Sequence, residues 1–351
     1  MLSVNNELCA LIDRLCDKPS LSLSEYELLI RSQTPELSAY AAKHAERIRR
    51  AIYGTDIYIR GLIEIGNVCR NDCFYCGIRK SNLHCERYVL TRKQILDCCD
   101  DGYKLGFRTF VLQSGENAVS VDLICQTVKE IKERYPDCAV TLSLGEYSRE
   151  DYERMYAAGA DRYLLRHETY DKAHYEKLHP KEMSFDNRIH CLYDLKDIGF
   201  QVGCGFMVGS PYQTSETLAK DLKFIEEFKP DMCGIGPFIP HKDTPFHAFP
   251  AGTAEQTVYL LSLIRLIHPN ILLPATTALG TIRSDGRKLG IMAGANVIMP
   301  NLSPDSAKEK YTLYDNKAIS GEEASANLAR IKQSMLEIGY NVVTARGDVK
   351  K

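Results

Sequence analysis

The sequence predicts an α/β fold, a (β/α)8 TIM barrel with an N-terminal helical prefix and a C-terminal helical extension. From Asp56 onward, short runs rich in β-branched and apolar residues alternate with runs at helical spacing. This alternation is typical of a parallel sheet. Eight strand-like runs in a chain of 351 residues suit a closed barrel better than an open doubly wound sheet. No low-complexity linker interrupts them, so we expect no second independent domain.

Residues 1–54 form the predicted helical prefix. Three runs within it place apolar residues at helical spacing. The first is marked by Leu8, Leu11 and Ile12, and the others cover 22–31 and 36–53. Ser22 and Glu25 have the spacing of a capping box at the start of the second helix. We expect this prefix to cap one end of the barrel.

Residues 55–303 form the predicted barrel. Period-two and β-branched patterning predicts strands over 57–65, 108–113, 139–144, 162–166, 201–206, 232–236, 271–275 and 295–299. Helical periodicity predicts helices over 91–105, 121–134, 149–158, 185–198, 215–228, 254–267 and 286–292. Gly159 and Gly294 stand where helix-to-strand turns are expected.

Residues 304–351 form the predicted extension, which we expect to pack on the barrel wall. An irregular segment rich in Tyr and Lys comes first, and a helix with one apolar face follows. That face consists of Ala324, Leu328, Ile331, Met335 and Ile338. Such a stripe is a packing surface rather than a cofactor site.

The composition excludes several classes of function. The 44 basic and 46 acidic residues nearly cancel, which gives no electrostatic reason to expect nucleic acid or an anionic membrane as partner. The thirteen cysteines are an odd number and none follows Cys233, so they indicate a reducing compartment rather than a disulfide framework. No signal-peptide pattern or apolar run of about eighteen residues is present. We expect a soluble, cytoplasmic protein that acts on small molecules.

Three cysteines after the first predicted strand carry the chemistry. Cys69, Cys73 and Cys76 have the spacing C-x3-C-x2-C, and Tyr75 directly precedes the last of them. A closed zinc site requires four ligands, whereas a cubane iron-sulfur cluster held by three cysteines keeps one iron open to another ligand. The alternatives are three unrelated thiols, or a zinc site completed by His84 or Cys85.

Polar and glycine-rich segments follow the other predicted strands, where a barrel places its catalytic groups. Gln113-Ser114-Gly115-Glu116 combines a glycine, which lets backbone approach a ligand, with a carboxylate that suits an ammonium group. The run from Thr141 to Glu146, which includes Ser143, ends the third strand, and Met207 lies in a glycine-rich segment after the fifth. A tight turn is the simpler interpretation of that last segment.

Two further strand ends carry candidate ligands. Arg166 and Glu168 fall on one side of an extended segment, so together they suit a zwitterion or a ribose diol; an ordinary surface ion pair is the alternative. Thr276 lies in a small, hydroxylated run after the seventh strand. His241 follows the sixth strand, and we interpret it as a solvated loop histidine.

The cysteine spacing is similar to that of the radical S-adenosylmethionine (SAM) superfamily. Five segments also resemble the HydE family of FeFe-hydrogenase maturases within the biotin synthase-like group. They are Gln113–Glu116, Leu142–Glu146, Arg162–Thr169, Gly234–His241 and Pro274–Ala278. The likeness runs from about residue 35 to about residue 303. Methylornithine synthase, which also belongs to this group, is the nearest competitor.

This resemblance implies a radical SAM enzyme in maturation of the di-iron subcluster of the hydrogenase H-cluster. It implies one 4Fe-4S cluster on Cys69, Cys73 and Cys76, and SAM held by Tyr75, Ser114, Gly115, Glu116, Ser143, Glu168, Arg188 and Met207. Implied partners are an electron donor such as ferredoxin or flavodoxin and the other hydrogenase maturases. A radical mutase or synthase acting on an amino acid, and a non-catalytic zinc protein, are the alternatives. A helix-surface arginine is the other interpretation of Arg188.

The cysteine count and the barrel together predict one cluster and an open pocket. Several family members carry three more cysteines near the C-terminus, but here no cysteine follows Cys233. We expect a lumen pocket lined by Arg60, Gln113, Thr141, Arg166 and Thr276 and closed by the tail around Tyr311. Two arginines in an apolar barrel require an anionic partner. A carboxylate-bearing or organometallic substrate would provide one.

Overall fold

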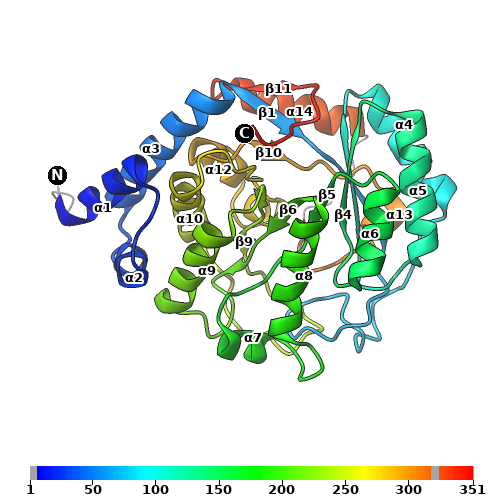
Figure 1. The fold of residues 1–351 in the computed structure, drawn as a ribbon, viewed down its shortest axis with the longest axis horizontal. Coiled ribbons are helices and arrows are strands. Elements are labelled where there is room, and N and C mark those ends of the chain that lie inside the picture. The colour runs from blue at the N-terminus through cyan, green and yellow to red at the C-terminus, as the bar shows by residue number, and fades with distance from the viewer. Residues whose placement is uncertain (1–5, 318–323, 351) are drawn as a thin grey trace.

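A computed structural model describes residues 6–317 and 324–350. Strands lie at the centre of the molecule and helices surround them (Figure 1). All the ladder pairings between its strands are parallel within these residues. The predicted α/β fold with a parallel sheet is therefore confirmed.

The helical prefix consists of α1 (Asn6–Asp17), α2 (Leu23–Arg31) and α3 (Pro35–Tyr53). The predicted capping box at the start of α2 is present, because Ser22 accepts from the Glu25 amide and the Glu25 carboxylate accepts from the Ser22 amide. α2 and α3 pack against α9 (Ser215–Phe228) and α10 (Ala254–Ile267), respectively. The prefix therefore covers outer helices (Figure 1), whereas we expected it to cap one end of the barrel.

Six strands form one parallel sheet in the order β2-β3-β4-β5-β6-β8. They are β2 (Gly61–Gly66), β3 (Thr109–Ser114), β4 (Ala139–Ser143), β5 (Arg162–Leu164), β6 (Gln201–Cys204) and β8 (Met232–Cys233). β1 (Asp56–Ile59) leads into β2 and pairs with β10 (Val297–Ile298). The first predicted strand, 57–65, is thus divided at Arg60. Its first half, β1, belongs to the sheet that contains β10, and its second half, β2, belongs to the six-stranded sheet.

The predicted seventh strand, 271–275, is not a regular strand in the structure. Isolated bridges join Leu272 to Met232 and Pro274 to Val297, so this segment still lies between β8 and β10. Proline has no backbone N–H to donate, so Pro274 cannot continue the pairing with β8 beyond Leu272. On the other side the Leu273 amide donates to the Asn296 side chain rather than to the backbone next to β10. The structure shows a barrel-like arrangement here rather than a continuous sheet.

A second, two-stranded sheet continues two of the predicted strands. β7 (Met207–Val208) pairs with β9 (Gly236–Pro237) beyond the ends of β6 and β8. Between β6 and β7 the chain passes Gly205, whose φ is 155° and whose missing Cβ would overlap the Gly234 carbonyl. This close backbone approach explains why glycine occupies position 205.

Helices cover the outside of the strands (Figure 1). Besides α9 and α10, the predicted helices are α4 (Arg92–Lys104), α5 (Val121–Arg134), α6 (Arg149–Ala157), α8 (Phe185–Ile198) and α12 (Gly286–Met292). Three short helices were not predicted: α7 (Lys172–Leu178), α11 (Thr277–Ile282) and α13 (Asp305–Lys308). They are short enough that periodicity alone gives little signal.

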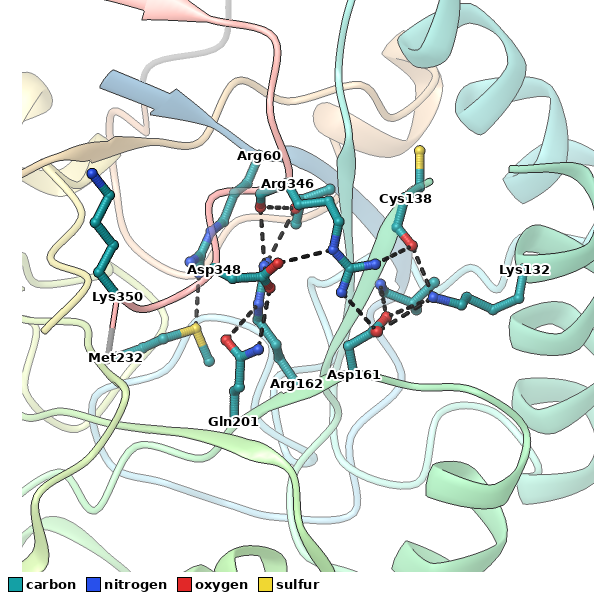
Figure 2. A network of polar contacts seen from close by, with 12 residues as sticks. Arg60, Lys132, Cys138, Asp161, Arg162, Gln201, Met232, Arg346, Asp348 and Lys350 are labelled. Atoms are coloured by element: carbon teal, nitrogen blue, oxygen red, sulfur yellow. Dashed lines mark hydrogen bonds and ion pairs between the residues drawn. The ribbon is translucent and has the colours of Figure 1, made fainter. Parts of the chain in front are cut away.

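The segment after residue 304 packs on the outside of the barrel-like sheet, and its last residues lie at the edge where several strands begin. α14 (Ala324–Leu336) buries Leu328, Ile331 and Met335. β11 (Asn341–Val343), which was not predicted, pairs in parallel with β1. Residues beyond β11 then run across the edge at which β3, β5 and β6 begin (Figure 2).

A polar network fixes this last segment (Figure 2). Arg162, whose side chain is fully buried, lies 2.5 Å from Asp348 and donates to the Arg346 carbonyl at 3.0 Å. Gln201 donates to the same Asp348 carboxylate at 3.1 Å. Arg346 in turn lies 3.0 Å from Asp161. The network closes the edge of the sheet opposite the strand ends that bear the cysteine loop.

Candidate active site

The cysteine loop follows β2 and is held by backbone contacts from distant segments. The Asn67 side chain donates through Nδ2 to the Glu86 carbonyl at 2.8 Å and to the Lys310 carbonyl at 2.7 Å. Arg87 donates to the Asn67 carbonyl at 2.7 Å. The Gly77 amide donates to the Leu313 carbonyl at 2.9 Å. The tail therefore helps to shape the loop, and neither Asn67 nor Arg87 was predicted from the sequence.

The three thiols of the loop are free and gathered together. Burial, and next the neighbouring Cys76 and Cys69, raise the pKa of the Cys73 thiol. Burial and then Cys69 raise the pKa of Cys76 to about 12. In the described residues no three His, Cys, Asp or Glu side chains converge on a single metal ion. A cubane binds each thiolate to a different iron, so three thiols that are close enough to raise one another's pKa, without converging on one point, are compatible with a cluster.

Glycines allow the backbone to approach this loop closely. A Cβ on Gly115 would overlap the Val68 carbonyl and lie 2.9 Å from the Cys69 Cβ. A Cβ on Gly77 would overlap the Thr312 carbonyl and the His241 ring. Larger residues at either position would push the loop outward. His241 itself is buried, so our interpretation of it as a solvated histidine was wrong.

A buried charge network stands beside the loop. The Glu116 carboxylate accepts from Arg70 Nε at 2.7 Å and from the Glu146 amide at 2.9 Å. Arg188 Nε lies 2.6 Å from Glu146 Oε1, and Arg188 Nη2 lies 3.7 Å from Glu116 Oε2. Arg188, Glu116 and Glu146 are each less than 9% exposed. Arg188 is therefore not a helix-surface arginine, and Glu146 is a partner that the sequence did not single out.

Electrostatics keep Arg188 charged despite its burial. Burial disfavours the cation, but Glu146, Tyr175 and Glu116 outweigh this effect, so the pKa of Arg188 is raised. Arg188 thus interacts with two buried carboxylates, and burial of these negative charges without a cation would be costly. The carboxylate of Glu116, which we expected to suit an ammonium group, is already engaged by protein donors.

Arg166 and Glu168 lie together, but not along an extended strand. β5 ends at Leu164, and Glu168 has a left-handed φ of 64°. Arg166 Nη2 nevertheless lies 3.1 Å from Glu168 Oε2. The Glu168 amide donates to the Gly205 carbonyl at 3.0 Å. A non-glycine residue in this conformation is uncommon and marks a position fixed by its surroundings.

Tyr75 and Met207 meet in one apolar cluster. Tyr75 and Phe74 pack against a buried group consisting of Leu178, Met207, Phe238 and Phe246. The Tyr75 hydroxyl lies 3.0 Å from His179 Nε2, and His179 Nδ1 lies 2.9 Å from the Tyr175 carbonyl. This pattern makes Nδ1 the donor and Nε2 the acceptor. Burial lowers the pKa of His179 to about 3, so a neutral imidazole orients Tyr75.

Ser114 and Ser143 occupy the ends of neighbouring strands. They are the last residues of β3 and β4, and both are partly exposed. The Ser114 hydroxyl donates to the Gly115 carbonyl at 2.7 Å. Both residues thus lie at the carboxyl ends of their strands, and the cysteine loop follows the carboxyl end of β2.

The six predicted pocket residues do not form one group. Gln113 donates to the Tyr311 hydroxyl at 3.3 Å, and Thr141 has a buried hydroxyl without a hydrogen-bond partner in the structure. Thr276 caps α11. Arg60 instead lies toward the opposite edge, 2.9 Å from Met232 Sδ (Figure 2).

The two predicted pocket arginines also differ in their partners. Arg166 pairs with Glu168, whereas no carboxylate among the described residues pairs with Arg60. Burial, and next Arg162, lower the pKa of Arg60. The expected shared anion for Arg60 and Arg166 is therefore unsupported. Both side chains were assigned to the barrel lumen from the sequence, which did not show that they have different partners.

Fold and site together define a radical SAM enzyme. The profile of the radical SAM superfamily matches residues 63–225, which include the cysteine loop and the charge network. The "[FeFe] hydrogenase maturase subunit HydE" of Thermotoga maritima is 46% identical over 285 residues, 81% of each chain. This chain accordingly belongs to the HydE-like maturases of the radical SAM superfamily. Membership implies a 4Fe-4S cluster, SAM, a small-molecule substrate and an electron donor.

Other relatives are more distant. A 3-methylornithine synthase of Methanosarcina barkeri is 26% identical over 313 residues, 88% of each chain. Among solved structures, methylornithine synthase (PylB) superposes with a TM-score of 0.82 at 24% identity, covering 95% of this chain and 97% of its own. HydG, a maturase of the [FeFe]-hydrogenase, gives 0.79 at 21% identity, covering 97% and 76%. These two structures support the fold.

None of the described helices is both long enough and apolar enough to cross a membrane.

Proposed function

We propose that this protein is a maturase that generates a 5′-deoxyadenosyl radical from SAM and uses it in assembly of the di-iron subcluster of an FeFe-hydrogenase. The observation that carries this proposal is the 46% identity to the Thermotoga maritima maturase over 81% of each chain. The substrate would be a small molecule, organic or organometallic.

The family resemblance supports the assignment of the cofactor-binding residues. Cys69, Cys73 and Cys76 would hold a single 4Fe-4S cluster, and Gly115 allows the backbone after β3 to approach the loop that carries them. When bound, the cluster supplies one electron to the SAM sulfonium. SAM would lie against Tyr75, Ser114, Gly115, Ser143, Glu168 and Met207, with Arg188 and Glu116 forming the charged wall behind it.

The protein's own residues then position SAM and exclude water. His179 holds the Tyr75 hydroxyl, and the Arg188 network keeps two carboxylates in fixed places without mobile counterions. Fixed donors and acceptors of this kind lower the cost of reaching the reactive geometry. Gln113, Thr141, Arg166, Thr276 and Tyr311 would face the substrate, while Arg60 contributes to the opposite end.

The architecture supports this assignment of roles. We infer that the strands close into a (β/α)8 barrel at 55–303, because isolated bridges carry the pairing from β8 through 272–274 to β10 and from there to β1. Residues 1–54 and 304–351 would act as a prefix and an extension packed on it. Free cysteines throughout the described residues suit the cytoplasm. Ferredoxin or flavodoxin would be the electron donor, and the other hydrogenase maturases possible partners.

A second candidate function is that of a methylornithine synthase-like radical enzyme acting on an amino acid. The superposition on PylB across 95% of this chain favours it. The identity of 26% to the synthase of Methanosarcina barkeri, against 46% to the maturase, argues against it. Both candidate functions use radical SAM chemistry on the same fold, so the structure is compatible with either.

The deciding experiment is activation of apo-hydrogenase in a defined anaerobic maturation mixture. We expect hydrogen production to depend on this protein, and Cys73→Ala to abolish it. SAM cleavage without hydrogenase activation, together with formation of 3-methylornithine from an amino acid, would establish the second function instead. A colourless preparation that retains zinc after anaerobic reconstitution would refute both.

A further inference from the structure

A cysteine, a histidine and an aspartate come together on the helical prefix. Cys16 and Asp13 belong to α1, and His44 belongs to α3. Cys16 Sγ lies 3.5 Å from His44 Nδ1, and His44 Nε2 lies 3.6 Å from Asp13 Oδ1. Both helices lie at the periphery of the molecule (Figure 1). None of the three residues belongs to the candidate active site.

A neighbouring arginine determines which nitrogen of His44 carries the proton. Arg47 Nη2 lies 3.2 Å from His44 Nδ1, and a guanidinium can only donate, so Nδ1 is an acceptor. The proton of the neutral ring then lies on Nε2, which faces the Asp13 carboxylate. Nδ1 therefore keeps the lone pair that a base needs, and this is the nitrogen beside the Cys16 thiol.

Tyr40 holds the carboxylate and the imidazole in place. Its hydroxyl donates to Asp13 Oδ1 at 2.7 Å, and its ring packs on the His44 ring with the centroids 4.7 Å apart. A carboxylate at the far nitrogen of an imidazole orients the ring and stabilises the imidazolium that forms when the ring accepts a proton. Thiol, imidazole and carboxylate thus have the order of nucleophile, base and orienting group.

The thiol and the imidazole are both neutral near pH 7. Burial raises the pKa of Cys16, and Arg47 opposes this effect. Burial, and next Arg47, lower the pKa of His44, which Asp13 opposes. The fraction of free thiolate is therefore small, but a neutral imidazole can take the proton as the sulfur attacks.

Exposed cations beside the thiol indicate the charge of the ligand. Lys43 and Arg47 are exposed on α3, and both act electrostatically on His44. On α1, Asp17 contributes one opposing charge near Cys16. A small disulfide that carries carboxylates, such as glutathione disulfide, therefore suits this surface better than a cationic disulfide does.

We propose that Cys16 is a nucleophilic thiol that forms a mixed disulfide with a small, carboxylate-bearing disulfide, with His44 as its base and Asp13 as the group that positions the base. Cys16 Sγ attacks one sulfur of the ligand, the S–S bond of the ligand breaks, and a new S–S bond forms. The thiol proton passes to His44 Nδ1 and then to the departing thiolate. Cys16 is oxidised and half of the ligand is reduced, so the ligand itself is the oxidant. This site is independent of the proposed function.

Cys125 is a matched control thiol. Like Cys16 it is half-buried on a helix, α5, and burial raises its pKa while an arginine, here Arg154, opposes this effect. No histidine contacts its sulfur in the part of the chain that the structure describes. It should react only as the free thiolate, so its rate should rise about tenfold per pH unit below its pKa.

The test is the rate of mixed-disulfide formation in the anaerobic, cluster-loaded protein with glutathione disulfide, assigned to each cysteine by peptide mass spectrometry. We expect Cys16 to react at a nearly constant rate from about pH 7 to about pH 8, because the neutral imidazole is fully available in this range. His44→Gln should slow the reaction about 100-fold, at the lower end of the range for a positioned base, and restore the rise with pH. Asp13→Asn retains an oxygen acceptor and should keep most of the rate, whereas Asp13→Ala should not.

The pH profile is measured on the unchanged protein, so it decides the question even if a variant does not fold. A Cys16 rate that rises with pH as steeply as that of Cys125, or that is equal in wild type and His44→Gln, would overturn the proposal. Cystamine, a cationic disulfide, should react with Cys16 more slowly than glutathione disulfide does, and Lys43→Gln should reduce this difference. Faster reaction with cystamine would overturn the assigned class of ligand.

Discussion

His167 Nε2 lies 3.2 Å from Asp221 Oδ1, and neither side chain has any exposed surface. The Gly205 amide donates to His167 Nδ1 at 3.3 Å, which leaves Nε2 as the donor to Asp221. Burial lowers the pKa of His167 to about 3, in agreement with a neutral ring. Asp221 also accepts from the Tyr170 amide. The pair thus fixes the backbone on both sides of the left-handed Glu168.

We predict that Asp221→Ala weakens SAM binding as well as stability. The substitution leaves the His167 Nε2–H and the Tyr170 amide without an acceptor, a loss of about 2–6 kcal/mol in unfolding free energy at about 1–3 kcal/mol for each group. Glu168 should then lose its fixed position. Calorimetric SAM titration and thermal unfolding would show both effects. Asp197→Ala, on the exposed face of α8, should change neither.

The cysteines divide into two sets with different expected behaviour. Cys69→Ala, Cys73→Ala or Cys76→Ala should abolish cluster binding and SAM cleavage, because each removes one of three ligands. Cys98 and Cys99 are buried in α4, and Cys125 lies in α5, where thiols act as small apolar side chains. Alanine at these positions should leave iron content near one cubane per chain. Equal iron loss in both sets would refute the ligand assignment.

Arg188 gives a prediction on stability. Arg188→Ala would leave Glu146 buried without a cation, while Glu116 keeps Arg70, and breaking such a buried pair costs about 3–5 kcal/mol. Arg188→Lys should recover part of the stability but not the bidentate reach. Thermal unfolding of the two variants, with the exposed Arg149→Ala as control, measures this difference. A melting temperature for Arg188→Ala equal to that of the control would contradict the network.

His179 gives a prediction on pH dependence. Its pKa is lowered to about 3 by burial, from an ordinary value of about 6.5. The unfolded chain therefore binds the proton first, and stability present above pH 6.5 is lost as the pH falls toward 3. From pH 7 to pH 5 this single group should cost about 2 kcal/mol.

The measurement is the free energy of unfolding of wild type and of His179→Gln across that pH range. His179→Gln should be less sensitive to acid, because glutamine does not titrate. His190→Gln, an exposed substitution on α8, should follow the wild type. Parallel curves for wild type and His179→Gln would show that the neutral imidazole makes no contribution.

Sequence patterns were sufficient for the periodic elements and the cysteine loop. Residues 91–105 and 254–267 were predicted as helices from apolar spacing, and the structure has them within one residue. β11 escaped notice because three residues give no period, and its pairing partner β1 is remote in sequence. The missing N–H of Pro274 helps to explain why the predicted strand 271–275 forms isolated bridges instead of a ladder.

The site was only partly accessible to the same reasoning. The family resemblance indicated Glu116 and Arg188 as SAM ligands. Their shared contact with Glu146 could not be predicted, because it depends on how β3, the segment after β4 and α8 pack together. Arg60 and Arg166 were both assigned to the barrel lumen, yet the structure gives them different partners, Met232 for Arg60 and Glu168 for Arg166.

The contacts of the cysteine loop also determine when it can form. The Gly77 amide needs the Leu313 carbonyl and Asn67 needs the Lys310 carbonyl, while Asn341 contacts Thr55 across 286 positions of sequence. Contacts of such long range form late and slow the folding of a domain. During synthesis the three thiols therefore leave the ribosome well before the segment that shapes their surroundings. Cluster insertion belongs after chain completion, and in the interval reactive cysteines depend on the reducing cell for protection.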